Sequence, residues 1–273
     1  MKKVVVITGG GSGIGLAAAK YMPKEKVIVV TGRTYSKLEK AINELKELGY
    51  EAYAKPCDTS KREQVKELVE YSASLGEVTN VIHSAGLSPA MSNPDYIMRV
   101  NALGTVYITE EFSKVMKSGV ILNVASNSAY MLPDFLANKK TFALADTNEE
   151  LFMNKVLKLS KLIKDEYKSS GLAYGLSKKF VIWYSAKKAF ELGSKGIRVV
   201  SVSPGLIATD MGNLEAKEGA SLLDTTAEKR MGKPEELGFA LATIVDERNG
   251  YLVGVDVLVD GGSVNGKILN NFS

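Results

Sequence analysis

Tyr174 and Lys178 stand four residues apart, a spacing that puts both side chains on one face of a helix, about 5–6 Å from each other. A free phenol has a pKa of about 10 and is therefore almost wholly protonated at neutral pH. An ammonium group at this range would favour the phenolate by roughly 3 kcal/mol at an effective dielectric constant of about 20. That is most of what a phenol needs in order to exchange protons near neutrality, so the pair predicts acid/base chemistry by a tyrosine.

The N-terminal part of the chain contains a glycine-rich segment, Thr8-Gly9-Gly10-Gly11-Ser12-Gly13-Ile14-Gly15. It follows a β-branched run at 4–7 and precedes a helix-compatible segment at 16–20. Glycines at such a turn allow positive φ and let the backbone approach a ligand closely. The N–H groups that begin the helix then point at a pyrophosphate. The segment predicts a dinucleotide site. Together with Tyr174 further along the chain, it predicts a nicotinamide-dependent oxidoreductase.

The pattern Thr-Gly-x-x-x-Gly-x-Gly, followed much later by Tyr-x-x-x-Lys, resembles the short-chain dehydrogenase/reductase family. The resemblance runs along almost the whole chain, because further motifs of the family stand in the family's order. They are Asp58, Asn101 within Asn-Ala-Leu-Gly-Thr, Ser126 after Ile-Leu-Asn-Val-Ala, Pro204-Gly205, the segment at 230–236, and Asp260-Gly261-Gly262. The resemblance implies an α/β fold, a doubly wound parallel sheet of the Rossmann type with helices on both faces.

Two features depart from the family pattern. Where the family usually reads Asn-Asn-Ala-Gly, this chain has His83-Ser84-Ala85-Gly86. The family's serine and tyrosine are normally about a dozen residues apart, whereas Ser126 and Tyr174 are separated by 48. The resulting insertion at about 127–173 is similar to that of the hydroxysteroid-dehydrogenase-like branch of the family.

The resemblance also implies four catalytic residues, which are Asn101, Ser126, Tyr174 and Lys178. In the reducing direction Tyr174 would donate its proton to the forming alkoxide while the cofactor supplies hydride. Ser126, with Ser128 as a nearby alternative, would hydrogen-bond the substrate oxygen. Lys178 would hydrogen-bond the nicotinamide ribose. Asn101 would shape a water path to Lys178, unless it is an ordinary turn asparagine.

A longer set of cofactor contacts follows from the same resemblance. It comprises Thr8, Gly9, Gly11, Ser12, Gly13, Ile14, Gly15, Arg33, Thr34, Asp58, Ser84, Ala85, Gly86, Tyr174, Lys178, Pro204, Gly205, Ile207 and Thr209. Within this set Asp58 is expected to reach the adenine amino group, and Pro204-Gly205 to border the nicotinamide.

Arg33 bears on which cofactor is preferred. An acidic residue after the second strand would hold the ribose 2′-hydroxyl of NAD, but this chain has Gly32 and then Arg33. A guanidinium suits a 2′-phosphate because its planar fork binds bidentately. The alternative is a surface arginine, and the family's second basic determinant is absent because Ser12 stands in its place. We expect NADP(H) to be preferred, with NAD possible.

These residues need a scaffold, and the apolar pattern supplies one. Strand-like runs at 4–7, 27–31, 78–82, 119–124, 197–203 and 252–259 alternate with amphipathic segments, which predicts right-handed crossovers and a parallel sheet. Ligands bind such sheets beyond the carboxyl ends of the strands. A helix at 37–48 is expected to end at Gly49. Capping boxes are expected at Ser60 with Glu63, and at Thr147 with Glu150.

The insertion predicts an additional helical module. Its apolar residues at helical spacing are Phe152, Val156, Leu159 and Ile163. We expect a homo-oligomer, most simply a dimer, with this module at or beside the interface. The alternative is a helix packed wholly on its own subunit. The segment at 206–229 is expected to act as a lid, with Met211, Leu214, Leu222 and Leu223 available to close on an apolar ligand.

Composition narrows the class of protein. The chain has 273 residues, 45% of them apolar, and no linker-like stretch, which fits one domain over 1–273. Its charge of +4 comes from interleaved cations and anions, so nucleic-acid binding is not expected. The single cysteine, Cys57, and the lack of a leader or membrane-length apolar run predict a soluble cytoplasmic protein. His83 is the only histidine, which excludes histidine triads and histidine metal clusters; it is expected to line the adenine-side wall or simply to pack.

Together these features predict an NADP(H)-preferring reductase of ketones or dehydrogenase of secondary alcohols, with a steroid or comparably bulky apolar carbonyl as first choice. A 3-oxoacyl thioester or a sugar-type carbonyl stays open. A non-catalytic regulator that binds the cofactor is the alternative of another class, and the complete set of four catalytic residues argues against it.

Overall fold

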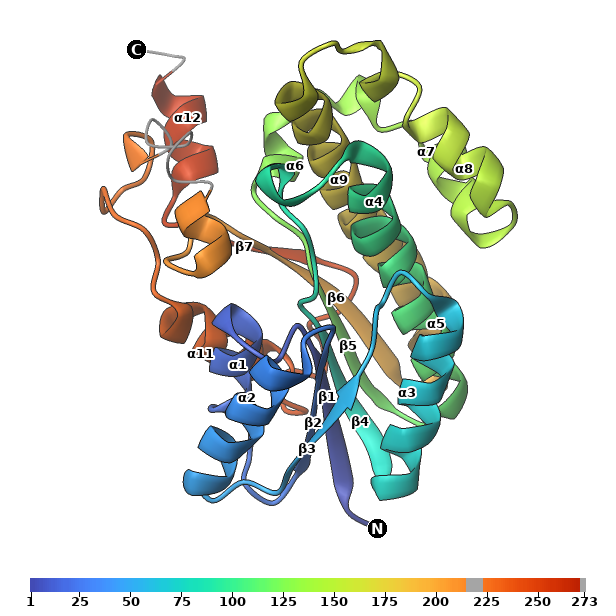
Figure 1. Cartoon of the computed structure of the whole chain (residues 1–273), viewed down its shortest axis with the longest axis vertical. Coiled ribbons are helices and arrows are strands. Elements are labelled where there is room, and N and C mark those ends of the chain that lie inside the picture. The colour runs from blue at the N-terminus through green and yellow to red at the C-terminus, as the bar shows by residue number, and fades with distance from the viewer. Residues whose placement is uncertain (215–222, 271–273) are drawn as a thin grey trace.

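The computed structural model describes residues 1–214 and 223–270, which form one sheet between two layers of helices (Figure 1). Seven parallel strands lie in the order β3-β2-β1-β4-β5-β6-β7. Their bounds are β1 (Lys3–Thr8), β2 (Val27–Gly32), β3 (Ala52–Pro56), β4 (Glu77–His83), β5 (Gly119–Val124), β6 (Ile197–Pro204) and β7 (Asp256–Val259). The predicted doubly wound parallel sheet is confirmed.

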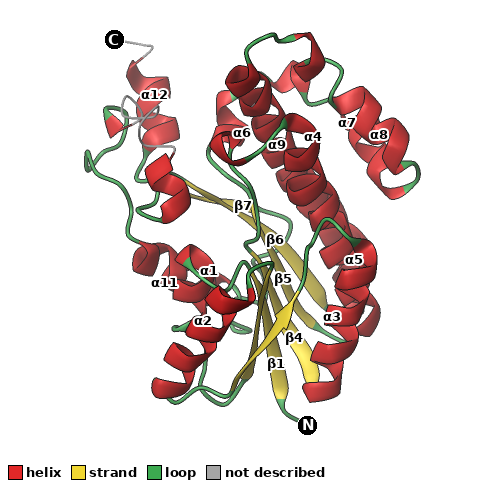
Figure 2. Ribbon diagram, viewed as in Figure 1, coloured by secondary structure: helices red, strands yellow, loops and turns green. Residues whose placement is uncertain are grey.

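Helices cover both faces of this sheet, as Figure 2 shows. One layer consists of α1 (Gly13–Ala19), α2 (Tyr35–Glu47) and α11 (Pro234–Ile244). The opposite layer consists of α3 (Arg62–Leu75), α5 (Gly104–Val115) and α9 (Glu166–Leu192). The shorter helices are α4 (Pro94–Met98), α6 (Ser128–Met131), α7 (Lys139–Phe142), α8 (Glu149–Val156) and α12 (Ser263–Asn270).

The strands are apolar runs because both of their faces are buried. Val4 and Val6 of β1 belong to the core that includes α5 and α9, whereas Val5 and Ile7 belong to the core under α1 and α11. All four side chains are fully buried. Among the residues that the structure describes, no helix is long and apolar enough to cross a membrane.

The predicted helix ends are correct at one place and wrong at two. Helix α2 ends before Gly49, whose φ of +85° is the left-handed conformation that follows many helices. Helix α3 begins after Lys61, because the Ser60 hydroxyl donates to the Asp58 carboxylate at 2.7 Å instead of capping the helix. Helix α8 is capped by Asn148, whose Oδ1 accepts from the Leu151 N–H at 2.9 Å, and not by the neighbouring threonine.

The insertion packs on its own chain. Helices α7 and α8 lie along the outer side of α9 in Figure 1, whereas α6 lies on the other side of that helix. Phe142 and Phe152 bring their rings 5.3 and 5.1 Å from the ring of Phe180 on α9. Phe152 and Val156 are buried, and the helix ends at Val156, so the apolar stripe does not continue through Leu159, which is 44% exposed. Phe152 and Val156 are therefore covered within their own chain, whereas a dimer with this module at or beside its interface stays a prediction.

A row of polar residues crosses five neighbouring strands near their carboxyl ends. The row is in register from β2 to β6 and consists of Thr31, Thr8, His83, Asn123 and Ser201. All five are buried. The Thr8 hydroxyl lies 2.7 Å from His83 Nδ1, and the Asn123 amide donates to Ser185 on α9 at 3.0 Å. Two of these contacts thus join β1 to β4 and β5 to α9 near the carboxyl edge of the sheet.

His83 makes the stability of the fold depend on pH. Burial, with the nearby positive charge of Lys178, lowers the pKa of His83 to about 3, against about 6.5 in an unfolded chain. Between these values the unfolded chain binds more protons than the folded one, so stability is lost as pH falls through this window. We expect the free energy of unfolding to fall by about 2 kcal/mol between about pH 7.5 and pH 5 through this residue alone.

Urea unfolding of the wild type and of His83→Asn at both pH values measures this contribution. Asparagine is the residue that the family usually has here, and it does not titrate. The variant should therefore lose about 2 kcal/mol less than the wild type over the same interval. Equal losses in the two proteins would contradict the buried neutral histidine.

Candidate active site

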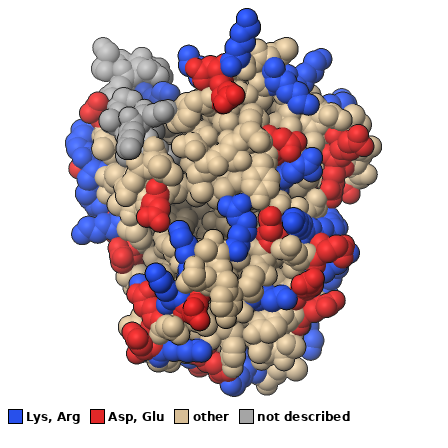
Figure 3. All heavy atoms as spheres, in the orientation of Figure 1, with Lys and Arg blue, Asp and Glu red and all other residues tan. Residues whose placement is uncertain are grey.

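A cavity of about 950 Å³ opens where the strands end at their carboxyl edge. Figure 3 shows a hollow near the middle of the face in view, with basic side chains at its rim. Every residue of the predicted catalytic and cofactor sets lines this cavity except Asn101. The structure thus brings together segments from positions 8 to 235 of the chain.

The glycine turn between β1 and α1 forms one wall of the cavity. Gly9 and Gly13 have φ of +67° and +56°, which favours glycine at both positions. A Cβ on Gly15 would lie 2.6 Å from the Gly9 carbonyl oxygen and from Ser84 Oγ, so only glycine fits. At these three positions the turn therefore presents backbone to a ligand. That is what a pyrophosphate requires.

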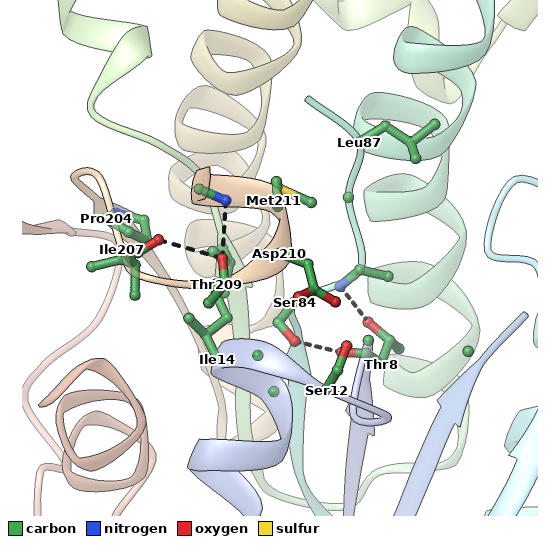
Figure 4. Close-up of a pocket in the computed structure, with 18 of the residues that line it drawn as sticks. Thr8, Ser12, Ile14, Ser84, Leu87, Pro204, Ile207, Thr209, Asp210 and Met211 are labelled. Carbon is green, nitrogen blue, oxygen red and sulfur yellow. Dashed lines mark hydrogen bonds between the residues drawn. The ribbon is translucent and has the colours of Figure 1, made fainter. Parts of the chain in front are cut away.

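The ends of β1 and β4 are tied together beside this turn, as the dashed lines in Figure 4 show. Ser84 Oγ donates to the Thr8 carbonyl, and the Ala85 N–H donates to Thr8 Oγ1 at 3.1 Å. His83 lies one residue below and is 2% exposed. His83 bonds to Thr8 and does not line the cavity, so of its two expected roles packing is the one that it has.

Helix α9 brings Tyr174 and Lys178 to the cavity. Lys178 Nζ lies 5.7 Å from the centre of the Tyr174 ring and donates to the Val124 carbonyl at 3.0 Å. Lys178 is 6% exposed, so its charge acts in a poorly solvated place. The hydrogen bond to Val124 joins this helix to the end of β5, two residues before Ser126.

Ser126 lines the same cavity although 48 residues separate it from Tyr174 in sequence. The insertion leaves the sheet after Ser126 and returns at the start of α9, so both side chains stay at the carboxyl edge. Ser126 Oγ accepts from the Ser128 N–H at 3.2 Å. Because this bond uses an oxygen lone pair, the hydroxyl proton can be donated to a ligand.

Asn101 lies behind the cavity wall. It belongs to a π-helical turn at 99–103 between α4 and α5, a distortion found often at functional sites. Its amide accepts from the Leu87 N–H at 2.8 Å and donates to the Leu87 carbonyl and to Ser177 Oγ. A Cβ on Gly86 would lie 3.3 Å from Asn101 Oδ1 and 3.5 Å from Lys178 Nζ. Asn101 therefore fixes the chain beside Lys178 rather than facing the cavity.

Tyr96 on α4 is a site residue that the sequence did not single out. Arg33 Nη1 donates to the Tyr96 hydroxyl at 3.0 Å, and that hydroxyl donates to Asp58 Oδ2 at 3.2 Å. Burial alone would raise the pKa of Asp58, but hydrogen bonds from Ser60 and Tyr96 and the charge of Arg33 hold it below its ordinary value. A tyrosine thus connects the two residues expected at the adenosine end of the cofactor.

The segment after β6 faces the glycine turn across the cavity. Figure 4 shows Thr209 near Ile14, and a Cβ on Gly13 would lie 3.4 Å from the Thr209 methyl carbon. Met211 lines the cavity, whereas Leu214 is 48% exposed and Leu223 is partly buried. Leu222, the fourth apolar residue expected in a lid, lies outside the described residues.

The outer part of the cavity, beside Tyr174, is mainly apolar. It is bordered by side chains from the segment after β4, from the first turns of α9 and from the segment after β6, which are Leu87, Pro89, Met91, Tyr167, Leu206 and Met211. Tyr167 and Met91 are 38% and 42% exposed, so apolar surface remains accessible at the mouth.

Comparison with known proteins agrees with this geometry. Residues 3–137 match the family model for short chain dehydrogenases, and residues 141–264 match the model described as enoyl-(acyl carrier protein) reductase. The chain is 28% identical to a short-chain dehydrogenase/reductase of Alternaria brassicicola over 269 residues, which covers 96% of each chain. It is also 28% identical to the cyclohexanol dehydrogenase of an Acinetobacter species, over 95% of this chain and 94% of that protein.

Among solved structures, an actinorhodin polyketide ketoreductase with NADPH superimposes with a TM-score of 0.77. The two chains are 20% identical over 97% of this chain and 98% of that one. At this identity the likeness to the ketoreductase shows the fold alone. Of the two family models, the first covers the glycine turn and the second covers Tyr174 and Lys178.

If Arg33 holds a 2′-phosphate, Arg33→Ala should weaken NADPH binding about 10- to 150-fold, because a charged hydrogen bond is worth about 1.5–3 kcal/mol. NADH binding should hardly change. Tyr96→Phe keeps the ring but removes both hydrogen bonds, so it should act in the same direction and less strongly. Fluorescence titration of each variant with both cofactors measures these effects.

Arg99→Ala is the matched control, since Arg99 lies on the segment next to Tyr96, pairs with Asp95 and does not line the cavity. It should bind both cofactors as the wild type does. Equal weakening of NADPH and NADH in Arg33→Ala would contradict recognition of the 2′-phosphate.

Proposed function

Since the chain belongs to the short-chain dehydrogenase/reductase family, whose members are NAD(P)-dependent oxidoreductases, we propose that it interconverts a ketone and a secondary alcohol with NADP(H). One observation carries the proposal. Tyr174, Lys178 and Ser126 line the same cavity as the glycine turn, although they come from distant parts of the chain. A proton donor and a dinucleotide cradle in one cavity are what hydride transfer to a carbonyl requires.

The residues of the cavity fit a dinucleotide. The turn at Gly9–Gly15 exposes backbone that suits the pyrophosphate, and Asp58 and Arg33, which line the same cavity, would hold the adenosine end. When bound, the nicotinamide supplies or accepts the hydride. NADP is favoured over NAD by Arg33 and by the lack of a carboxylate directly after β2. The NADPH in the ketoreductase structure supports the same choice.

In the proposed mechanism the side chains of the protein orient the carbonyl and supply the proton. Ser126 donates a hydrogen bond to the carbonyl oxygen and orients it. Tyr174 then gives its phenolic proton to the oxygen as negative charge develops there. The ammonium of Lys178, buried and held by the Val124 carbonyl, stabilises the phenolate that is left. In the direction of alcohol oxidation the same groups act in reverse.

The apolar outer part of the cavity supports a bulky apolar ketone as substrate, including a steroid or another fused ring. Tyr167, Met91 and Leu206 offer surface for a ring and few hydrogen-bonding groups. A sugar-type carbonyl would leave its hydroxyl groups without partners there, which is costly. The name of the cyclohexanol dehydrogenase indicates an alicyclic alcohol as the substrate of that relative.

We further propose that the chain is a single cytoplasmic domain that forms a homodimer. One sheet carries every described strand, and the only cysteine, Cys57, is buried and free. Phe190 and Tyr251 are almost fully exposed near the β7 edge, and Val253 is 41% exposed. A Cβ on Gly254 would lie 3.4 Å from that of Ala189, so these apolar segments adjoin.

Sedimentation of the purified chain tests the assembly. We expect the mass of a dimer for the wild type and that of a folded monomer for the double variant Phe190→Asp, Tyr251→Asp, because charge in an apolar interface is costly. A monomeric wild type would contradict the dimer.

Replacing the proton donor tests the proposed reaction. Tyr174→Phe should lower turnover of a reducible ketone about 10²- to 10⁴-fold, which is the usual contribution of a general acid. The Kd for NADPH should stay close to that of the wild type. Tyr21→Phe is the control and should keep wild-type turnover, because Tyr21 is exposed and does not line the cavity. Wild-type turnover in Tyr174→Phe would remove the phenol from the mechanism.

A further inference from the structure

Gly171 is a glycine inside α9 that packing does not explain. Glycine weakens a helix more than any residue except proline. Gly175, four residues further on, has a clear reason, because a Cβ there would lie 2.6 Å from a methyl carbon of Leu132. A Cβ on Gly171 would meet nothing within 4 Å. The surrounding protein therefore leaves room for a Cβ at this position, yet the chain has none.

The space beside Gly171 belongs to the cavity. Tyr167, Gly171, Tyr174 and Lys178 follow one another at spacings of four, three and four residues, so they share one face of α9. All four line the cavity. Gly171 lies one helical turn from Tyr174, about 4.5 Å along the axis, on the side away from Lys178.

The opposite border of this space is apolar and fixed in place. Ser170 Oγ donates to the Ser92 carbonyl at 3.0 Å, which holds the segment at 89–92 against the start of α9. That segment contributes Pro89 and Met91 to the cavity, and Tyr167 borders it one turn before Gly171. The space is therefore bordered by an aromatic ring, a thioether and a proline, which suits a hydrocarbon ring better than a polar group.

We propose that Gly171 sets the size of the substrate. The missing side chain leaves room for the fused rings of a bulky apolar ketone, whose carbonyl reaches Tyr174 one turn further along the same face. This inference rests on the proposed function, because it takes Tyr174 to mark the position of the reacting carbonyl. The weaker helix at Gly171 is then the cost of an open substrate site.

The test measures kcat/KM with NADPH for ketones of increasing size, namely cyclohexanone, tetralone and androstanedione, in Gly171→Ala and Gly171→Leu. A leucine side chain in the space of a bound ring should lower kcat/KM for androstanedione about 10- to 100-fold. Activity with cyclohexanone should change by less than about 3-fold, and so should the Kd for NADPH. Gly171→Ala should lower the ratio of kcat/KM for androstanedione to that for cyclohexanone by a smaller factor. It should also raise the Tm by about 1–3 °C.

Gly193→Leu is the matched control. A Cβ on Gly193 also meets nothing within 4 Å, but this glycine ends α9 far from Tyr174 and does not line the cavity. It should leave the order of the three ketones unchanged. The same size dependence in Gly171→Leu and in the wild type would overturn the inference. If the leucine variant does not fold, an unchanged size ratio in Gly171→Ala would overturn it instead.

Calorimetry with the three ketones and the complex of the enzyme with NADP⁺ separates this inference from the proposed function. A wild type that binds androstanedione but reduces no ketone would contradict the proposed reaction. In that case, loss of androstanedione binding in Gly171→Leu would still support the role of Gly171. A wild type that binds none of the three ketones overturns both.

Discussion

Helix α9 packs in the core on one face and lines the cavity on another, and the rest of the structure depends on its holding both positions. One face packs in the core, where Phe180 and Tyr184 are fully buried. Another face lines the cavity with Tyr174 and Lys178. Because successive residues turn by about 100° around a helix axis, a slip of one residue would remove both groups from the cavity. The hydrogen bond from Lys178 to the Val124 carbonyl locks this register against β5.

The insertion contributes to the same constraint. It could have projected as a separate module, but Phe142 and Phe152 pack on Phe180 of α9, and Glu149 accepts a hydrogen bond from Tyr107 of α5. Its acidic residues also pair with cations of neighbouring helices, as Asp146 does with Lys187 at 2.7 Å. The long separation between Ser126 and Tyr174 thus supports the position of the catalytic helix, while the parallel strands bring both residues to one edge.

Much of the fold follows from local sequence. The β-branched runs predicted six strand regions because a parallel sheet buries both faces of its strands. Strand β3 lacked such a run, since it alternates small residues with Tyr53 and Lys55 at the edge of the sheet. The two predicted capping boxes failed because each depended on spacing alone. The Ser60 hydroxyl binds a carboxylate from a preceding turn, and Asn148 competes with its neighbour for the same cap.

In the site, too, local features could be predicted from the sequence and long-range contacts could not. Residues within short motifs, such as the glycine turn and the Tyr174–Lys178 pair, were predictable because their geometry is local. Tyr96, the position of Asn101 behind the wall and the burial of His83 were not, because each depends on contacts between segments far apart in the chain. Gly171 illustrates the point most clearly, since only the structure shows that no side chain opposes it.

Direct observation of hydride transfer tests the central claim that this cavity performs chemistry and does not only bind a cofactor. NADPH that carries deuterium at the transferable position of its nicotinamide is mixed with the wild-type protein and a ketone that it reduces or binds. If the protein is the proposed reductase, each oxidised cofactor leaves one deuterium on the carbinol carbon of the alcohol. Bound NADPH that stays reduced, with no labelled alcohol from any ketone tried, would contradict it.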